Sequence, residues 1–382
     1  MALISKLEAI GDAVRGVTGG EDKLTLDEIA EAISGMGSGD DDVLAALVAR
    51  TLTEIESDAI TAAGAYAFYQ CSALERVSLP YLATAANRSF AELTALTELY
   101  APSLTSTGMY SFSSCTALTS VTVPSLSDLG SHTFASCTAL AAISLPAATT
   151  IGSSAFSGCT ALTAFDFSIV DTLEDSAFRT TGLTSVELPA DTTFGTYVFA
   201  NCDSLASASL PLTTTVGGYT FYLCPALTTV ELPIATTVGT CSFYGCSSLE
   251  AISLPAVTAL SSRLLQACTS LTSVDAPLAA SMGSYCFYGC TALETLDLPL
   301  CASIDAKAFS GCTALTTLIL RSETACELLA STSFSDTPIA GGTGYVYVPS
   351  DLVETYQAAT YWSTYADQFR AIEDYPDVCG ES

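Results

Sequence analysis

An alternation of apolar and polar residues recurs about every 22 positions along most of the chain. Residues 118–124, LTSVTVP, are one example, with apolar Val121 and Val123 on either side of a polar threonine. Alternation at period two predicts a short strand that turns both valines toward a core and the residue between them outward. Pro124 then ends the strand, because proline has no backbone N–H to give to a sheet.

A phenylalanine followed three residues later by a cysteine marks the next part of each repeat. This spacing corresponds to one helical turn and puts both side chains on one face. The markers follow one another every 22 residues, with the exception of one step of 21 residues. Leu265 replaces phenylalanine in one repeat. Glycines such as Gly152, in TTIGSSAF, suit the corner between this turn and the strand. The marker phenylalanines are Phe68, Phe90, Phe112, Phe134, Phe156, Phe178, Phe199, Phe221, Phe243, Phe287 and Phe309.

One such repeat cannot bury its apolar face alone, whereas stacked copies share a continuous core. We therefore predict an α/β solenoid of about twelve repeats, with a parallel sheet on one side and short helical turns on the other. The predicted organisation is a helical hairpin and linker over residues 1–39, an N-terminal cap over 40–66, the solenoid over 67–333, and a strand–helix cap with a tail over 334–382.

The combination of L-x-x-V-x-L-P with IGxxAFxxC, from about residue 60 to 333, resembles the leucine-rich repeat of the BspA-like, Treponema type. The pattern is broken at Leu93, Ser168, Thr181 and Arg321. The resemblance implies a curved solenoid whose parallel sheet lines one side. A surface of that kind is long and open, which favours binding over catalysis in an enclosed pocket.

The charge balance narrows the range of partners. Forty acidic residues against eleven basic ones give a formal net charge of −29. Nucleic acid and anionic membranes are disfavoured, because both require clustered lysine and arginine. No apolar run approaches the length of a membrane-spanning helix, and residues 1–16, MALISKLEAIGDAVRG, lack the unbroken apolar core of a signal peptide. We therefore expect neither insertion in a membrane nor export by the ordinary route.

The fifteen cysteines are interpreted as packing residues. Ten of them follow the marker by three residues, where a small apolar side chain must fit and where Leu93 stands in one repeat. The others show no C-x-x-C spacing, and a single histidine cannot complete a zinc site. Free cysteines fit assembly in a reducing cytosol. No enzyme motif is present either, and His132 occupies a tyrosine position of the repeat, so we predict neither catalysis nor a cofactor.

The outward strand position, between the two core residues, is a candidate binding surface. Like charges on adjacent strands destabilise a sheet, so the acidic residues there need compensation by a cation such as Ca²⁺, by a basic partner, or by water alone. Asp275 and Asp297 are the candidate calcium ligands. The candidate ligand-binding residues of this position are Asp166, Glu187, Glu231, Asp275, Asp297 and Tyr100.

A second candidate surface flanks the Phe–Cys turn. Tyr219 and Tyr222 are three residues apart, as are Tyr285 and Tyr288, so each pair shares one face of its turn. Tyrosine rings with polar tips suit recognition of sugars or proteins. The alternative is that they only cover the outer side of the stack.

Residues 1–37 differ from the repeats. A helical stripe, a GVTGG break and a Thr25–Glu28 capping box predict two short helices. Their apolar sides predict either a cap on the first repeat or a docking element for a partner or for other copies of the chain. The apolar residues are Leu3, Leu7, Ile10, Val14, Ile29 and Ile33.

Both ends of the chain resemble segments of phage proteins. LEAIGDAVRGVTGGEDKLTLDEIAEAI is similar to an N-terminal segment of tail and baseplate-associated proteins of phages that infect Gram-positive bacteria. Residues 337–369 resemble the closing cap of repeat proteins from such phages. We expect a last strand over residues 345–348, a helix from about Ser350, and Trp362 packed against the end of the stack.

These resemblances imply a virion-associated recognition protein of a phage or prophage, assembled in the host cytoplasm. It would dock to virion proteins through residues 1–37 and bind a host-surface protein or glycan through the solenoid. Two alternatives remain open: a structural tail or head decoration that contacts only virion proteins, and a bacterial surface adhesin.

Overall fold

The computed structural model describes residues 52–58 and 60–380. The apolar residues predicted to dock a partner within residues 1–37 lie outside this range. The described residues form two compact units, the first ending at Leu183 and the second beginning at Thr184. No helix in the described ranges combines the length and apolar character needed to cross a bilayer.

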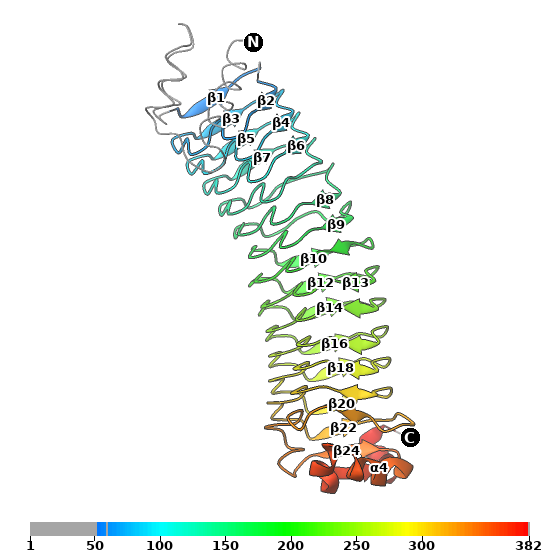
Figure 1. The fold of residues 1–382 in the computed structure, drawn as a ribbon. Coiled ribbons are helices and arrows are strands. Elements are labelled where there is room, and N and C mark those ends of the chain that lie inside the picture. The colour runs from blue at the N-terminus through cyan, green and yellow to red at the C-terminus, as the bar shows by residue number, and fades with distance from the viewer. Residues whose placement is uncertain (1–51, 59, 381–382) are drawn as a thin grey trace. The chain divides into compact units, whose positions relative to one another are not determined.

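The first unit contains two parallel sheets built from equivalent strands of successive repeats (Figure 1). The register advances by one repeat, so that Glu54 lies beside Arg76 and Arg76 beside Glu98. The three-residue strands are β1 (Glu54–Glu56), β3 (Arg76–Ser78), β5 (Glu98–Tyr100) and β7 (Ser120–Thr122). The two-residue strands are β2 (Ala62–Ala63), β4 (Thr84–Ala85) and β6 (Ser106–Thr107), followed by the pair β8 (Thr150–Ile151) and β9 (Thr172–Leu173).

The second unit repeats this arrangement (Figure 1). Its longer strands are β10 (Ser185–Glu187), β12 (Ser207–Ser209), β14 (Thr229–Glu231), β16 (Ala251–Ser253), β18 (Ser273–Asp275), β20 (Thr295–Asp297) and β22 (Thr317–Ile319). Its two-residue strands are β11 (Thr193–Phe194), β13 (Thr215–Val216), β15 (Thr237–Val238), β17 (Ala259–Leu260), β19 (Ser281–Met282), β21 (Ser303–Ile304) and β23 (Glu327–Leu328). The parallel solenoid of 22-residue repeats is therefore confirmed.

The structure corrects the prediction of one strand per repeat. Most two-residue strands place a polar residue outward and an apolar one inward, as Thr215 and Val216 do. It also corrects the predicted helical turns. Cys71 N donates to Phe68 O at 3.2 Å, but the neighbouring Gln70 has φ of 58°. A left-handed residue cannot continue a right-handed helix, so the Phe–Cys segment is a tight turn.

The structure describes residues 52–58 and 60–66 of the predicted N-terminal cap. Strands β1 and β2 lie within it and pair with β3 and β4 in the register of the repeats. The repeating architecture therefore begins by Glu54.

A glycine corner precedes several of these tight turns. A Cβ atom on Gly152 would lie 2.4 Å from Leu129 O of the previous repeat. Real Cβ atoms do not approach a carbonyl oxygen this closely, so glycine lets the two backbones pack at this corner.

The core of each unit is a ladder of stacked phenylalanine rings. In the first unit, the centroids of Phe90 and Phe112 are 5.1 Å apart and the rings are 4° from parallel. In the second, Phe221 and Phe243 are 5.6 Å apart at 7°. These rings are fully buried. Their spacing follows the separation of neighbouring strands, because one ring is added with each repeat.

The cysteines pack beside this ladder, as predicted. The fourteen whose side chains the structure describes are all buried, and none forms a disulfide. Seven of these thiols donate to the carbonyl of the phenylalanine 25 residues earlier, as Cys137 Sγ does to Phe112 O at 3.2 Å. Burial raises the pKa of the Cys159 and Cys268 thiols well above the usual value. These thiols are therefore protonated hydrogen-bond donors at neutral pH.

A strand and short helices close the second unit, as predicted. Trp362 is buried, and its Nε1 donates to Cys326 O at 2.7 Å. The hydroxyl of Tyr356 accepts from Cys326 N at 2.7 Å. The elements are β24 (Tyr345–Val348), η1 (Ser350–Leu352), α4 (Val353–Ala358), η2 (Trp362–Gln368), β25 (Phe369–Ala371), η3 (Ile372–Asp374) and α5 (Pro376–Cys379).

The cap also covers part of the outward strand surface. Strands β24 and β25 extend the sheet of β20 and β22 in parallel. Ile319, which stands at an outward strand position, is buried in a small cluster with Tyr347 and Ile372. The outward surface of the last repeat is therefore closed by the cap.

Cys301 and Cys326 form a close thiol pair beneath this cap. Their sulfurs lie 3.5 Å apart, whereas a disulfide bond is about 2.05 Å long. The hydrogen bond with Cys326 lowers the pKa of Cys301, which favours the thiolate that attacks in disulfide exchange. We expect incubation with oxidised glutathione to join this pair slowly, because both residues are buried.

Mass spectrometry of unreduced peptides measures this cross-link, and Cys301→Ser is the control that removes it. The prediction is wrong if Cys301 and Cys326 remain reduced in the folded protein while both oxidise in the unfolded chain.

Candidate binding surfaces

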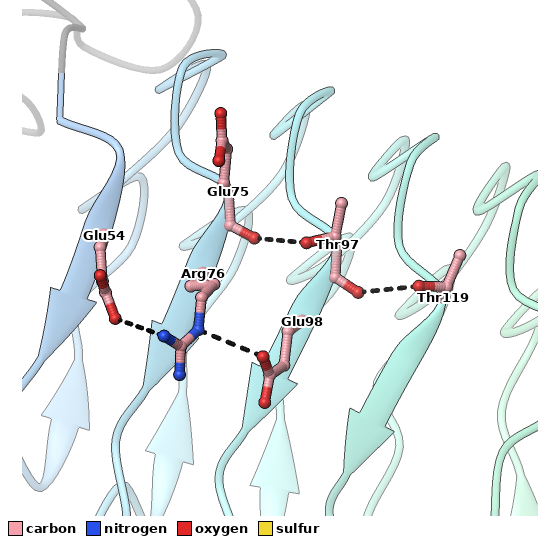
Figure 2. Close-up of polar contacts among 6 residues, drawn as sticks. All are labelled: Glu54, Glu75, Arg76, Thr97, Glu98 and Thr119. Carbon is pink, nitrogen blue, oxygen red and sulfur yellow. Dashed lines mark hydrogen bonds and ion pairs between the residues drawn. The ribbon is translucent and has the colours of Figure 1, made fainter.

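The outward strand surface of the first unit contains a row of charges that pair with one another (Figure 2). Arg76 Nη1 lies 2.9 Å from Glu54 Oε1, and its Nε lies 3.2 Å from Glu98 Oε2. The hydroxyls of Thr97 and Thr119 donate to the carbonyl 22 residues earlier, at 3.0 and 3.2 Å. These ion pairs are about half exposed and contribute little to stability. The sequence carried the signal for them, because Glu54, Arg76 and Glu98 are each 22 residues apart.

The other candidates on this surface of the first unit are Tyr100 and Asp166. Tyr100 lies at the end of β5 and is exposed. Asp166 lies outside any strand, and its Oδ1 accepts the Ser168 backbone N–H at 2.9 Å. That hydrogen bond lowers the pKa of Asp166. It holds the carboxylate in a local turn rather than in a row on the sheet.

In the second unit, the acidic residues Glu231, Asp275 and Asp297 are compensated by partners within the chain. Ser209 Oγ donates to Glu231 at 2.7 Å. Ser253 Oγ donates in the same way to Asp275 at 2.8 Å. Compensation by a side chain of an adjacent strand was not among the expected solutions.

Asp297 has a stronger partner in Arg321. The Arg321 guanidinium donates to Asp297 through Nε and Nη2, each reaching a carboxylate oxygen at 2.9 Å. Asp275 and Asp297 do lie on the neighbouring strands β18 and β20. Among residues 52–58 and 60–380, however, no group of three or more His, Cys, Asp or Glu side chains is arranged to hold a metal ion. The geometry gives the predicted calcium site no support. Glu187 ends β10 with its side chain exposed.

The tyrosines beside the Phe–Cys turn come together in the second unit. The rings of Tyr197 and Tyr219 stack at 4.3 Å, those of Tyr222 and Tyr244 stack at 4.9 Å, and those of Tyr219 and Tyr222 lie 5.7 Å apart. We call these four residues, which span three repeats, the tyrosine patch. All four are half-buried. Tyrosines three residues apart therefore do share a face of their turn, as predicted.

A hydrogen bond to Cys241 raises the pKa of Tyr219 to about 12. The Tyr219 hydroxyl therefore stays protonated at neutral pH and can both donate and accept hydrogen bonds. The patch offers a partner apolar ring surface together with neutral hydroxyl groups.

Two tyrosines of the patch, Tyr197 and Tyr219, occupy a repeat position at which every residue named below has a left-handed backbone. Non-glycine residues adopt this conformation at a cost of about 1–2 kcal/mol each. We call these twelve residues the left-handed column: Tyr66, Arg88, Tyr110, His132, Ser154, Ser176, Tyr197, Tyr219, Cys241, Arg263, Tyr285 and Lys307. Nine of these twelve residues are aromatic or basic. The tyrosine pairs alone do not reveal this shared property. The 22-residue spacing of Arg88, Arg263 and Lys307 from tyrosines was the available signal.

Basic and aromatic members of this column stack on one another. In the first unit, the Arg88 guanidinium lies 4.7 Å from the ring centroid of Tyr110, and His132 stacks on the same ring at 4.3 Å. Burial lowers the pKa of His132, so its imidazole is neutral at pH 7. His132 is thus a stacking residue beside the turn, which agrees with its interpretation as an outer-surface residue.

In the second unit, two cations lie at one ring. The Arg263 guanidinium is 4.3 Å from the ring centroid of Tyr285, and Lys307 Nζ is 5.4 Å from it. Tyr288 lies beside them, with its ring centroid 5.6 Å from that of Tyr285. The second predicted tyrosine pair is therefore part of a mixed basic and aromatic cluster.

Comparison with known proteins agrees with this repeat geometry. The family described as "BspA type Leucine rich repeat region (6 copies)" matches residues 49–106, 83–206 and 214–340. This match begins after residues 1–37 and ends at residue 340, so it covers only the first residues of the predicted C-terminal cap. No curated protein matches the chain.

A solved structure shows the same fold. A leucine-rich repeat protein from Bacteroides ovatus ATCC 8483 is 24% identical, with a TM-score of 0.61, and the match covers 85% of each chain. A leucine-rich cell surface protein from Faecalibacterium prausnitzii A2-165 is 23% identical over 72% of this chain and 80% of that one, with a TM-score of 0.45. Because the family's model matches most of the chain, the chain belongs to the family of BspA-type leucine-rich repeat proteins.

Proposed function

We propose that the protein is a recognition protein without enzymatic activity, which binds a protein or glycan on another surface through the tyrosine side of its turns. The tyrosine patch is the observation that carries this proposal. Tyrosine and arginine dominate the energetics of many binding surfaces, because each ring brings a large apolar area at a small entropic cost. The outward strand surface of the second unit fits this role less well, since Glu231, Asp275 and Asp297 already have partners in the chain.

The finer proposal is a virion-associated protein of a phage or prophage that recognises a Gram-positive host. The resemblance of residues 1–37 and of the C-terminal cap to phage segments supports it. In this arrangement residues 1–37 dock to virion proteins, and the repeats face the host. A bacterial surface adhesin of the same repeat family is the alternative, with the same binding surface in a different location. A structural decoration of the virion would have no host ligand.

Sedimentation of labelled protein with a panel of Gram-positive cells and isolated walls tests the binding function. We expect saturable binding to a few strains. Replacing Tyr219 and Tyr222 together with alanine should weaken it by about tenfold or more, because two rings of the patch are lost. Tyr81→Ala is the matched control, since Tyr81 is 58% exposed and lies outside the tyrosine patch.

Circular dichroism of each variant establishes that the fold is intact. Unchanged affinity in the folded double variant would place the binding surface elsewhere, and binding to no strain would favour the structural decoration. Antibody detection of the protein in purified virions or in cell envelopes then separates the phage protein from the adhesin.

A further inference from the structure

We propose that the second unit carries a separate binding site, formed by Arg263, Tyr285, Tyr288 and Lys307, for an acidic glycan that bears carboxylates. We call these four residues the cation–tyrosine site. The proposal goes beyond the recognition function above, because it assigns a different set of residues and a class of ligand. It also differs in charge from the tyrosine patch, which is neutral.

The cation–tyrosine site retains its positive charge. The Arg263 guanidinium donates from Nη1 to Gln266 Oε1 at 2.9 Å and lies over the Tyr285 ring, so both partners are neutral. Arg321, in contrast, has its charge neutralised by Asp297. In a chain with a net charge of −29, two cations held at one aromatic ring form a local positive site that can attract an anion.

The spacing of the two cations favours an extended ligand. Arg263, Tyr285 and Lys307 occupy the same position in three successive repeats, and all three have a left-handed backbone with φ of 58°, 61° and 55°. Since strands of neighbouring repeats lie about 4.8 Å apart, positions two repeats apart are separated by about 10 Å. The two cations therefore suit a ligand with carboxylates at intervals along a chain, rather than a single small anion.

An exposed aromatic surface lies beside the cations. Tyr288 is 38% exposed, and its ring is tilted by 48° from that of Tyr285. An exposed ring next to a guanidinium matches an acidic sugar, which offers an apolar C–H face and a carboxylate on one rigid ring. Stacking on Tyr285 also restricts the cations before the ligand arrives, which reduces the entropy lost on binding. A flexible acidic peptide would use the cations but not the exposed ring.

Isothermal titration of the full chain with polygalacturonate and with polysialic acid tests this proposal. We expect at least one of them to bind, and the affinity to fall as salt is raised, because salt screens exposed charges. Polyglutamate and purified wall teichoic acid serve as the peptide and phosphate arms, and neutral dextran is the uncharged control. The carboxylate glycan should bind more tightly than the other polymers.

Variants then assign the binding to this site. We expect Arg263→Ala and Lys307→Ala each to weaken glycan binding by about tenfold, the effect of losing one charge-assisted contact. Arg370→Ala is the matched control, because Arg370 also lies over a tyrosine, at 4.2 Å from the ring of Tyr345, but in the C-terminal cap. Tyr288→Ala should weaken binding of the glycan but not of polyglutamate.

Several results would overturn the proposal. Binding of neither acidic glycan would do so, as would glycan binding that Arg263→Ala and Lys307→Ala leave unchanged. Tighter binding of polyglutamate or teichoic acid would assign the cations to a peptide or a phosphate polymer instead. The Tyr219 and Tyr222 double variant should keep its affinity for the glycan, so failure here is distinguishable from failure of the tyrosine patch.

Discussion

Replacing Phe221 with alanine is expected to lower the free energy of unfolding by about 3–5 kcal/mol. The Phe221 ring is fully buried, and it stacks on Phe199 at 5.7 Å and on Phe243 at 5.6 Å. Its removal would leave a cavity between two repeats. Because the stability of a repeat protein comes from interfaces between neighbours, one substitution weakens two interfaces. Urea denaturation followed by circular dichroism measures the change.

Leu223→Ala is the matched control for this prediction. Leu223 lies two residues further on and is 39% exposed, so its loss should change the free energy of unfolding by no more than about 0.5 kcal/mol. Equal effects of the two substitutions would show that the phenylalanine ladder does not hold the repeats together.

Replacing Trp362 with alanine is expected to release the C-terminal cap, at a cost of about 3–5 kcal/mol to its stability. The indole is fully buried between Phe334, Tyr356 and Phe369, with ring centroids 5.5–5.6 Å away. The substitution also leaves the carbonyl of Cys326 without its donor, which adds to the loss. Hydrogen exchange of amides in the cap measures the opening.

Two further variants separate the contributions of the ring and the hydrogen bond. Trp362→Phe keeps an aromatic ring but removes the N–H, and should cost about 1–3 kcal/mol. Tyr361→Ala changes a neighbouring residue that is 42% exposed and should leave exchange unchanged. Protection of β24 and α4 that survives in Trp362→Ala would contradict the prediction.

Strands and turns with a repeated pattern could be predicted from sequence because the same residue types return at fixed spacing. The two-residue strands could not be predicted, because two residues such as Thr215 and Val216 are too few to show an alternation within the strand. The left-handed column also escaped prediction. Tyrosine, arginine and lysine disfavour this backbone conformation, so their presence at Tyr285 or Arg263 gave no hint of it.

Two departures from the repeat pattern have a structural role that their residue types alone do not indicate. Ser168 and Arg321 stand where other repeats have proline. The structure shows that Ser168 gives Asp166 the backbone N–H that proline lacks, and that Arg321 pairs with Asp297. Both departures therefore serve acidic residues of the outward strand surface. Their partners lie two and twenty-four residues away, so neither distance matches the repeat.

The left-handed column bears on how the binding specificity of this chain can evolve. Its twelve positions share one backbone conformation, although their side chains range from serine to tyrosine and arginine. One of these side chains can therefore be exchanged for another within the same backbone conformation, and the exchange changes the chemistry displayed at that position. Within each unit, neighbouring positions of the column are about 4.8 Å apart, so each unit displays these side chains at regular intervals. New binding specificities can arise by substitution at one of these positions or by duplication of a repeat, while the fold stays the same.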